Sequence, residues 1–359
     1  MSSRILAAMA ALTILAGCGK PSAPPEPAPL LNVGAPRTMH IDSPTLKAVK
    51  ARGRLNCGVH QGLPGFAWPD NHGEIQGFDA DFCRALAAAV LGDADAVHFI
   101  RLDTKSRFTA LQAKQVDVLV RNTSWTFTRD AGLGLDFAGV NYYDGQGFLA
   151  PKSLNLQSAV ELNGAKICVE AGTTTEQTLA EFFHSRGLKY QPVVLDTEEK
   201  ARDAYQREAC DAFSADVSAL AAARSIFNNP QAHVILPDVI SKEPLGPAVR
   251  QGDDAWADIV RWTLNALILA EELKITAKTV DAARKDGDAE TRRLLGEDDY
   301  GAMLGLKADW AYQAISQVGN YGEIFERNLG PKSPLRLERG LNAQWNAEKP
   351  GLIYAPPMR

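Results

Sequence analysis

The sequence has no long run of lysine and arginine. Its 359 residues include 38 Lys and Arg against 43 Asp and Glu, a formal net charge of -5. A nucleic-acid-binding chain needs a basic stripe to neutralise phosphates, so no nucleic-acid partner is expected. The chain also has no Cys-x-x-Cys motif and no pair of histidines at ligand spacing, which argues against a zinc or other metal site. Gly-x-Ser-x-Gly, Walker A and Gly-x-Gly-x-x-Gly patterns are missing too, and we expect no cofactor.

What the sequence does contain is typical of a soluble globular protein. Hydrophobic residues make up 45% and charged residues 23% of the chain, a balance that does not indicate disorder over most of the length. The length exceeds the usual limit for one hydrophobic core. Two domains are therefore expected.

The N-terminus has the features of an export signal. A basic residue, Arg4, precedes the apolar stretch 5–17, which is too short to span a bilayer comfortably. The stretch ends in Leu-Ala-Gly-Cys, which resembles the lipobox of bacterial lipoproteins, with Cys18 as the lipid-bearing residue. The alternative is an ordinary secretory signal with a chance cysteine. We assign residues 1–17 to a signal peptide and 18–44 to a proline-rich tether.

Four further cysteines remain, an even number that indicates disulfides in an exported protein. Three pairings are open. Cys57 and Cys83 lie in one half of the chain, and Cys168 and Cys210 lie in the other. If the halves are separate lobes, only the pairing within each half is natural, and each bridge would contribute ~3–4 kcal/mol.

Strand-like and helix-like segments alternate from about Thr45, which predicts an α/β fold with parallel sheets. The pattern restarts after Pro151, so two successive blocks are expected. A long amphipathic helix over 255–273 follows, and the tail from Asn320 is predicted to be a turn-rich strap. The predicted strands are 55–59, 97–102, 116–120, 165–169, 192–195, 211–213 and 232–235, and the predicted helices are 79–91, 106–114, 174–186, 198–208 and 218–226.

Polar loops follow several of the predicted strands. They cover residues 60–66, 121–130 and 170–176. In open α/β sheets, ligands bind at the carboxyl ends of the strands. Two lobes facing each other with such loops would form a ligand cleft.

One of these loops, Arg-Asn-Thr-Ser-Trp-Thr-Phe-Thr-Arg-Asp (121–130), carries an arginine in an unusual place. Thr126 is well placed as the N-cap of a helix starting at Phe127, so Arg129 lies in the first turn, where the helix dipole is already positive. A cation there is useful if an anion binds against both. The alternative is a solvated surface arginine. Arg121 is expected to be structural.

The second block offers a matching set of groups. Thr173 and Glu176 fit a capping box at a helix start, which would leave N–H groups and hydroxyls to meet the same anion from the other side. Asp216 follows a strand and would either accept from an ammonium group or cap the next helix. An arginine with helix N-termini at one end and a carboxylate at the other is complementary to an α-amino acid zwitterion.

Long stretches of the sequence resemble the solute-binding proteins of bacterial amino-acid ABC transporters, especially the general L-amino-acid-binding branch. The resemblance covers about Lys47 to Arg359. The matching stretches include CGVHQGLPGFAWPD, GFDADFCRALAAAV, RFTALQAKQVDVLVRNTSWTFTRD, LDFAGVNYYDGQGFLA, KICVEAGTTTE and NYGEIFERNLG.

The resemblance implies a two-lobed periplasmic-binding-protein fold of type II, with two hinge strands and the ligand in the cleft between the lobes. Residues 45–148 would form the first part of lobe 1, residues 149–246 would form lobe 2, and residues 247–359 would return to lobe 1 and end in a C-terminal strap.

By motif position, the resemblance also assigns ligand contacts. Arg129 would pair with the ligand α-carboxylate, with Thr174 and its neighbour Thr173 touching that carboxylate from lobe 2. Asp216 would take the α-ammonium group. The remaining assigned residues are Asn122 and Ser124, which would support these contacts, and Leu63, which replaces an aromatic clamp and leaves room for varied side chains.

The function implied is that of a non-enzymatic receptor that captures L-amino acids, with broad specificity, and delivers them to the permease subunits of an ABC transporter. We expect a monomer in the periplasm or cell envelope, tethered to a membrane through Cys18. The alternative is an amino-acid or prephenate-type dehydratase on the same scaffold. His60, Glu170 and Asp144 are the nearest candidate acids and bases, and they form no recognisable pair. A sensor that docks to a signalling receptor would share the same pocket.

Overall fold

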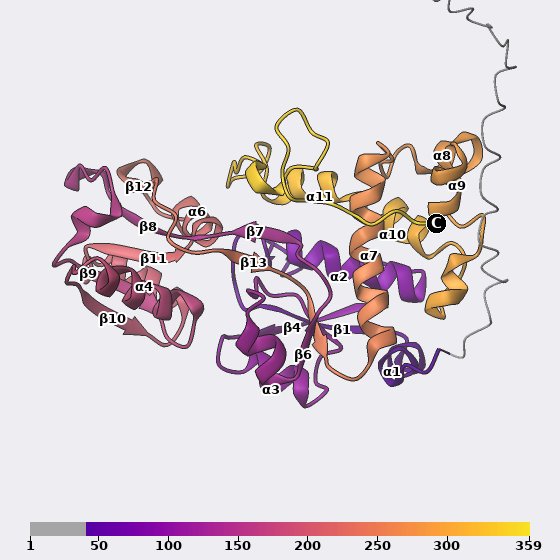
Figure 1. Cartoon of the computed structure of the whole chain (residues 1–359), viewed down its shortest axis with the longest axis horizontal. Coiled ribbons are helices and arrows are strands. Elements are labelled where there is room, and N and C mark those ends of the chain that lie inside the picture. Colours follow the sequence, from indigo (N-terminus) through magenta and orange to yellow (C-terminus); the bar gives the residue numbers. More distant parts are fainter. Residues whose placement is uncertain (1–40) are drawn as a thin grey trace, which may run out of the picture. The chain divides into compact units, whose positions relative to one another are not determined.

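Two mixed β-sheets organise the part of the chain that the structure, a computed structural model, describes (Figure 1). That part is residues 41–359. The predicted signal peptide, the lipidation site Cys18 and most of the predicted tether lie outside the described residues.

The first sheet has the strand order β4-β1-β5-β14-β6. Strand β1 pairs in parallel with β4 and β5, whereas β14 runs antiparallel to β5 and β6. Strand β14 comes more than 100 residues after β6, so the chain returns to this sheet after forming the second one. The strands are β1 (Leu55–His60), β4 (Val97–Leu102), β5 (Val118–Leu119), β6 (Leu135–Phe137) and β14 (Ala248–Arg250).

The second sheet has the order β10-β9-β11-β8-β12. Strand β9 pairs in parallel with β10 and β11, and β8 runs antiparallel to β11 and β12. The strands are β8 (Gln146–Pro151), β9 (Lys166–Glu170), β10 (Gln191–Leu195), β11 (Ala212–Asp216) and β12 (His233–Ile235).

The expectation of purely parallel sheets is therefore wrong, and the connection between the sheets explains why. Two antiparallel strands, β7 (Tyr142–Asp144) and β13 (Glu243–Leu245), carry the chain out to the second sheet and back. Strand β8 continues from β7 and β14 follows β13, so each enters its sheet against the direction set by the βαβ units. We call β7 and β13 the hinge strands.

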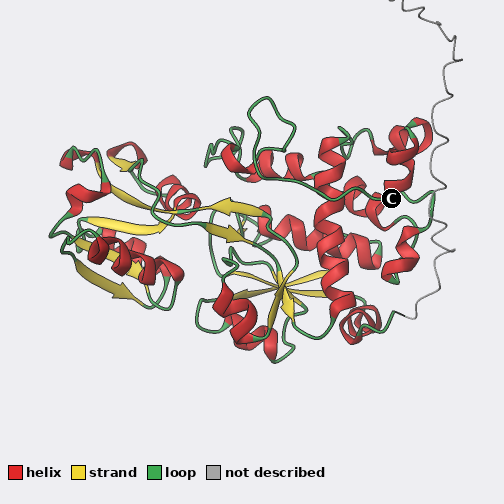
Figure 2. Cartoon of the chain, in the orientation of Figure 1, coloured by secondary structure: helices red, strands yellow, loops and turns green. Residues whose placement is uncertain are grey.

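Helices cover both sheets (Figure 2). We use lobe 1 for the first sheet with α1–α3 and α7–α11, and lobe 2 for the second sheet with α4–α6. A short hairpin, β2 (Trp68–Pro69) and β3 (Ile75–Gln76), precedes α2. The helices are α1 (Pro44–Arg52), α2 (Phe78–Leu91), α3 (Arg107–Gln112), α4 (Thr174–Ser185), α5 (Glu198–Gln206), α6 (Val217–Ser225), α7 (Asp254–Glu272), α8 (Val280–Asp286), α9 (Ala289–Leu294), α10 (Trp310–Val318) and α11 (Tyr321–Asn328).

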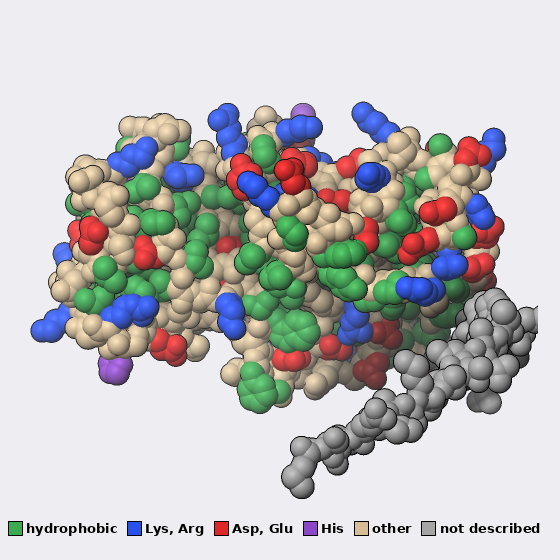
Figure 3. Space-filling model, turned by 45° about the horizontal axis from the view of Figure 1, so that its top comes forward, with side chains coloured by type: hydrophobic (Ala, Val, Ile, Leu, Met, Phe, Trp, Pro, Cys, Tyr) green, Lys and Arg blue, Asp and Glu red, His purple; other side chains and the backbone are tan. Residues whose placement is uncertain are grey.

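The predicted long helix is α7, which lies against α2, α10 and α11 in the core of lobe 1. Its buried residues Trp256, Val260, Thr263 and Leu267 recur at helical spacing, as an amphipathic helix requires. The Trp256 indole Nε1–H donates to the carbonyl oxygen of Asp117 at 2.9 Å. No helix within residues 41–359 is both long and apolar enough to cross a bilayer. Lysine and arginine side chains on the face in Figure 3 are scattered among acidic ones.

The tail differs from the prediction at its start. A capping box opens helix α11: the Glu323 N–H donates to Asn320 Oδ1 at 2.8 Å, and Asn320 N–H donates to Glu323 Oε2 at 3.0 Å. Beyond α11 the chain is mostly loop, as expected. There the Asn342 side chain accepts from the Tyr143 N–H at 2.7 Å and donates to the Tyr143 carbonyl at 3.0 Å, so the strap is attached to hinge strand β7.

Both disulfides join cysteines within one half of the chain, which confirms the pairing expected for separate lobes. Cys57 on β1 is bonded to Cys83 on α2, and Cys168 on β9 is bonded to Cys210, just before β11. The second bridge closes the longer loop, with a sequence separation of 42 residues. Each bridge thus fixes one lobe internally, and within residues 41–359 no disulfide joins one lobe to the other.

Replacing Cys168 and Cys210 together by alanine should lower the free energy of unfolding by about 3–4 kcal/mol, because the unfolded chain regains the entropy of a long loop. Urea denaturation followed by circular dichroism measures the change. Wild-type protein treated with a thiol reductant should move in the same direction. A double variant with the midpoint of the oxidised wild type would contradict the stabilising role of this bridge.

Candidate functional site

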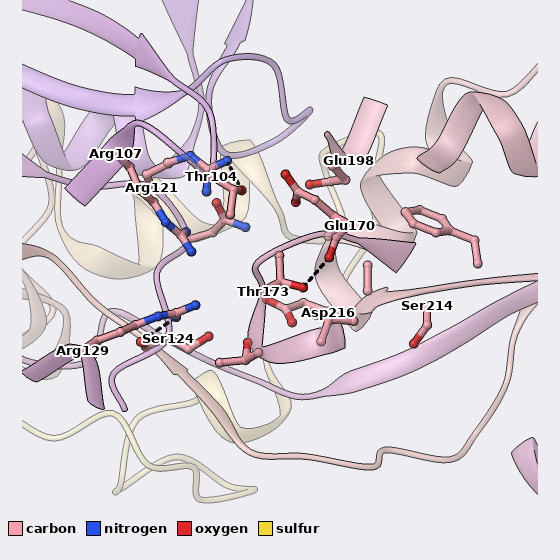
Figure 4. A pocket seen from close by; sticks show the side chains of 16 residues that line it. Thr104, Arg107, Arg121, Ser124, Arg129, Glu170, Thr173, Glu198, Ser214 and Asp216 are labelled. Atoms are coloured by element: carbon pink, nitrogen blue, oxygen red, sulfur yellow. Dashed lines mark hydrogen bonds between the residues drawn. The ribbon is translucent and has the colours of Figure 1, made fainter. Parts of the chain in front are cut away.

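A cavity opens where the carboxyl ends of strands from the two sheets face each other (Figure 4). It contains about 490 Å³ of space free of atoms, part of it open to solvent. Side chains that follow β4, β5, β9, β10 and β11 line it, as the rule for open α/β sheets predicts. The lining residues are Thr104, Arg107, Arg121, Asn122, Ser124, Arg129, Glu170, Thr173, Thr174, Thr175, Glu198, Phe213, Ser214, Ala215, Asp216 and Ala219.

Arg129 lies in this cavity rather than on the surface. Thr126 caps the turn that holds it: its hydroxyl accepts from the Arg129 N–H at 3.3 Å, at the start of a short π-helix, η1 (Thr128–Gly132). The guanidinium donates to the carbonyl of Ser124 at 2.9 Å and lies over the Phe108 ring, 5.5 Å from its centroid. No acidic side chain among residues 41–359 forms an ion pair with it. Arg129 is therefore a buried cation with donors left for an anion.

The loop that carries Arg129 is also attached to a hinge strand. The Trp125 N–H donates to the Pro244 carbonyl at 2.8 Å, and Ser124 forms a bridge with Leu245. Asn122 has a left-handed backbone conformation, with φ of 33°, and its N–H donates to Asp79 at 3.1 Å. The Asn122 Oδ1 atom is buried and accepts no hydrogen bond within the described residues. Asn122 and Ser124 both line the cavity.

On the lobe 2 side, the start of α4 contributes three threonines. Thr173 is the N-cap, with its hydroxyl accepting from the Glu176 N–H at 3.1 Å. In a full capping box the Glu176 carboxylate would accept from the Thr173 N–H. Here it accepts from the N–H of the preceding residue, Gly172, at 2.8 Å. Thr174 donates to Glu243 on β13 at 3.1 Å. The Thr173 hydroxyl also donates to the Glu170 carbonyl at 2.8 Å, so the start of α4 lines the cavity with both of these hydroxyls already bonded.

Asp216 lines the cavity and does not cap the helix that follows it. Asp144 of β7 takes that role, since its Oδ2 accepts from the Ser218 N–H at 3.3 Å. The Asp216 carboxylate is consequently left facing the cavity. Burial raises its pKa well above the usual range, and the neighbouring carboxylates Asp144 and Glu243 raise it further. Burial likewise raises the pKa of Asp144, to about 6.

Leu63 is not a cavity residue. It is 1% exposed and lies in the core of lobe 1, because a tight turn bonds it to Ala67 and turns its side chain inward. The polar loop 60–66 therefore does not contribute a wall at this position, and the argument for broad specificity from Leu63 has no support here.

The sequence did not place four charged residues in the cavity. Arg121 was expected to be structural, Glu170 was considered only as a candidate acid or base, and Arg107 and Glu198 were not singled out. The same carboxyl-end rule that found Arg129 and Asp216 could have found them. Arg107 follows the turn after β4, Glu170 ends β9, and Glu198 follows β10.

Contacts between the lobes occur both at the cavity and on the surface. His60 of β1 is buried, and its Nδ1 accepts from the Gly62 N–H at 3.0 Å, so the proton is on Nε2, which lies 3.4 Å from Glu198. Burial lowers the His60 pKa, and the Arg121 guanidinium lowers it further. Lys105 pairs with Asp196 at 2.6 Å on the surface. Within residues 41–359 no group of three or more His, Cys, Asp or Glu is arranged to hold a metal ion.

Comparison with known proteins agrees with this geometry. Residues 55–279 match the family model of bacterial extracellular solute-binding proteins, family 3. The chain is 53% identical over 318 residues to the general L-amino acid-binding periplasmic protein AapJ of Rhizobium johnstonii, covering 88% of this chain and 93% of that protein. It is 52% identical to the glutamate/glutamine/aspartate/asparagine-binding protein BztA of Rhodobacter capsulatus, over 88% and 93% of the two chains.

A solved structure is similarly close. It is an ABC transporter periplasmic binding protein from Brucella ovis with glutathione bound, and it shares 53% identity with this chain. The TM-score is 0.86, and the match covers 88% of this chain and 99% of the other. The two sheets, the hinge strands and the cavity between the strand ends are thus features of a known fold. The chain belongs to the bacterial extracellular solute-binding proteins, family 3.

Proposed function

We propose that this protein is a receptor that captures L-amino acids and delivers them to the permease of an ABC transporter. The observation that carries the proposal is the placement of Arg129 and Asp216 in one cavity, where neither is neutralised by an ion pair within residues 41–359. A free α-amino acid has the matching carboxylate and ammonium groups. The relatives AapJ and BztA, which are named as amino-acid-binding proteins, support the same ligand class.

Each group of the ligand head would have its own contacts. The α-carboxylate would lie against Arg129 and the start of α4, next to Thr173 and Thr174, where the helix dipole favours an anion. The α-ammonium group would donate to Asp216, with Asn122 Oδ1 and Ser124 as further acceptors. Because these residues come from both lobes, the bound ligand would stabilise the closed arrangement by its differential affinity.

A binding role is favoured over catalysis. The dehydratase alternative needs a general acid or base aimed at the ligand, and the candidates are otherwise engaged. The His60 Nε2–H faces Glu198, and Asp144 caps α6. Glu170 lines the cavity, but it lies among arginines and has no neighbouring base. The close relatives named above are described as binding proteins.

We also propose that the protein is exported, lipid-anchored through Cys18 and monomeric. The sequence Leu-Ala-Gly-Cys after a short apolar stretch supports the anchor. Residues 1–17 would be removed, and residues 18–44 would tether the two lobes to the membrane. Lobe 1 would consist of residues 45–148 and 247–359, and lobe 2 of residues 149–246. Tethering would raise the local concentration of the receptor near its permease.

Arg129→Ala and Asp216→Ala should each weaken amino-acid binding by about tenfold to hundredfold. Each removes a charge-assisted hydrogen bond that contributes ~1.5–3 kcal/mol, and 1.4 kcal/mol corresponds to a factor of ten. Titration calorimetry against a panel of L-amino acids measures the effect. The wild type should bind several chemically different members of the panel.

The exposed residues Arg101 and Asp95 in lobe 1 provide matched controls. Arg101→Ala and Asp95→Ala make the same charge changes outside the cavity and should bind like the wild type. Unchanged binding in Arg129→Ala would overturn the site assignment. Ligands recovered after incubation should be chemically intact, and turnover of an amino acid or of prephenate would contradict the receptor function.

Binding should weaken as the pH falls through the raised pKa of Asp216. The ligand-free carboxyl holds its proton more readily than usual because it is buried beside Asp144 and Glu243, with Arg129 opposing that effect. An ammonium group favours the ionised form, so below this pKa binding must release a proton and the Kd rises by up to tenfold per pH unit. Calorimetry between pH 5 and 8 in buffers of different ionisation enthalpy measures this release. A variant Asp216→Asn should bind weakly with a nearly flat pH profile, and proton release as large as that of the wild type would place the titrating group elsewhere.

Cys18→Ser should move the protein from the membrane fraction to the soluble periplasmic fraction, because the thiol is the proposed site of lipid attachment. Metabolic labelling with a radioactive fatty acid, followed by fractionation, measures both changes. Cys18→Ser that stays in the membrane fraction with its label would show that another residue carries the anchor, and an unlabelled, soluble wild type would favour an ordinary secretory signal.

A further inference from the structure

Two buried arginines remain in the cavity after the ligand head group has been assigned. Figure 4 shows Arg121 beside Thr104 and Arg107 between Arg121 and Arg129, with Glu170 and Glu198 opposite. One α-carboxylate accounts for Arg129 alone. The other two guanidinium groups therefore require a separate explanation.

Arg107 has almost no hydrogen bonds of its own. It is 3% exposed, and its nearest acceptor is the Thr123 hydroxyl at 3.5 Å. The buried Nε atom bonds to nothing within residues 41–359, and no carboxylate there lies within ion-pair distance. The group is held instead by stacking over the Phe108 ring, 4.6 Å from its centroid. A guanidinium has five N–H donors, so most of these donors are available to a ligand.

Arg121 is placed beside it by the backbone. Its Nε–H donates to the Leu102 carbonyl at 2.9 Å and its Nη2 to the Thr104 hydroxyl at 3.1 Å. Both acceptors are neutral, so the charge itself is not compensated by these bonds. Burial lowers the pKa of both Arg107 and Arg121, and in Arg107 the neighbouring Arg121 is the next largest cause. Two like charges buried together are costly unless an anion joins them.

The acidic residues opposite do not serve as that anion. Glu198 faces His60 at 3.4 Å, and neither Glu198 nor Glu170 is within ion-pair distance of either guanidinium. Glu170 is close enough to act on both arginines electrostatically, and burial raises its pKa. The two cations and the two carboxylates are thus not in direct contact, and the Thr104 hydroxyl, which accepts from Arg121, lies between Arg121 and Glu170.

We propose that Arg107 and Arg121 form a second carboxylate site, which makes dicarboxylic L-amino acids the preferred ligands of this protein. A side-chain carboxylate can accept two parallel bonds from a guanidinium, and it would neutralise the two buried charges together. This inference rests on the proposed amino-acid receptor function. It assigns the side-chain specificity of the same cavity to two named residues.

The test compares ligand pairs that differ by one charge and little else. Titration calorimetry at pH 7.5 should give the wild type at least tenfold tighter binding of L-glutamate than of L-glutamine, and of L-aspartate than of L-asparagine. Arg107→Met should lower the glutamate affinity at least tenfold and leave the glutamine affinity within threefold, so that the ratio collapses. The matched control is Arg101→Met, which removes an exposed charge from the same lobe and should keep the wild-type ratio.

A second variant tests the proposal even if Arg107→Met fails to fold. Glu170→Gln removes the negative charge opposite the pair and should tighten glutamate binding several-fold while glutamine binding stays the same. A falling or unchanged glutamate-to-glutamine ratio in this variant contradicts the proposal. So does an equal loss of both ligands in a folded Arg107→Met, because that result would make Arg107 part of a general contact between the lobes.

Different results contradict the receptor function and the second carboxylate site. A wild type that binds no amino acid overturns the proposed receptor function. A wild type that binds glutamate and glutamine equally well keeps that function and overturns only the second carboxylate site.

Discussion

Separation of charge across one cavity is the constraint on which the rest of the site depends. Lobe 1 presents three buried guanidinium groups, from Arg107, Arg121 and Arg129, and lobe 2 presents carboxylates, yet no ion pair joins the two sets. Burying such charges is expensive unless they are paired. The fold offsets the cost with neutral contacts: backbone carbonyls accept from Arg121 and Arg129, and one ring, Phe108, lies under both Arg107 and Arg129. The charges are thereby positioned without being neutralised.

A second set of contacts keeps the Asp216 carboxylate available and fixes the start of α4. The N–H groups at the start of α6 are served by Asp144, which is why Asp216 does not turn back to cap its own helix. At α4, Glu176 bonds to Gly172, and Thr174 is held by Glu243 of a hinge strand. Local hydrogen bonds thus decide which carboxylates and hydroxyls face the cavity. Two residues that make these hydrogen bonds, Asp144 and Glu243, belong to the hinge strands, so the site and the connection between the lobes are built together.

Part of the architecture could be predicted from the sequence, since strand and helix periodicity placed β1, β4, β5, β9–β12 and α2–α7 within a few residues. It gave no prediction for α1 or α8–α11. The direction of the antiparallel strands β8 and β14 could not be predicted, because it depends on where the chain crosses between the sheets and not on the local sequence pattern. In the site, Arg129 was predictable from its place in the first turn of a helix, and Asp216 from its place after a strand. Arg107 and Leu63 show the limit of this reasoning. Tertiary packing sets how deeply each side chain is buried and where it points: Arg107 points into the cavity, and Leu63 points into the core.

The attachment of Asn342 to Tyr143 has a consequence for the behaviour of the protein at high concentration. Hinge strands β7 and β13 form a two-stranded ribbon, and such a ribbon presents unpaired N–H and C=O groups along its outer edges. Asn342 occupies both outward groups of Tyr143 on one edge. On the other edge, Pro244 has no N–H to offer and its carbonyl accepts from Trp125. At these positions the ribbon offers no template for another chain, so a connection that must bend is also protected from edge-to-edge aggregation.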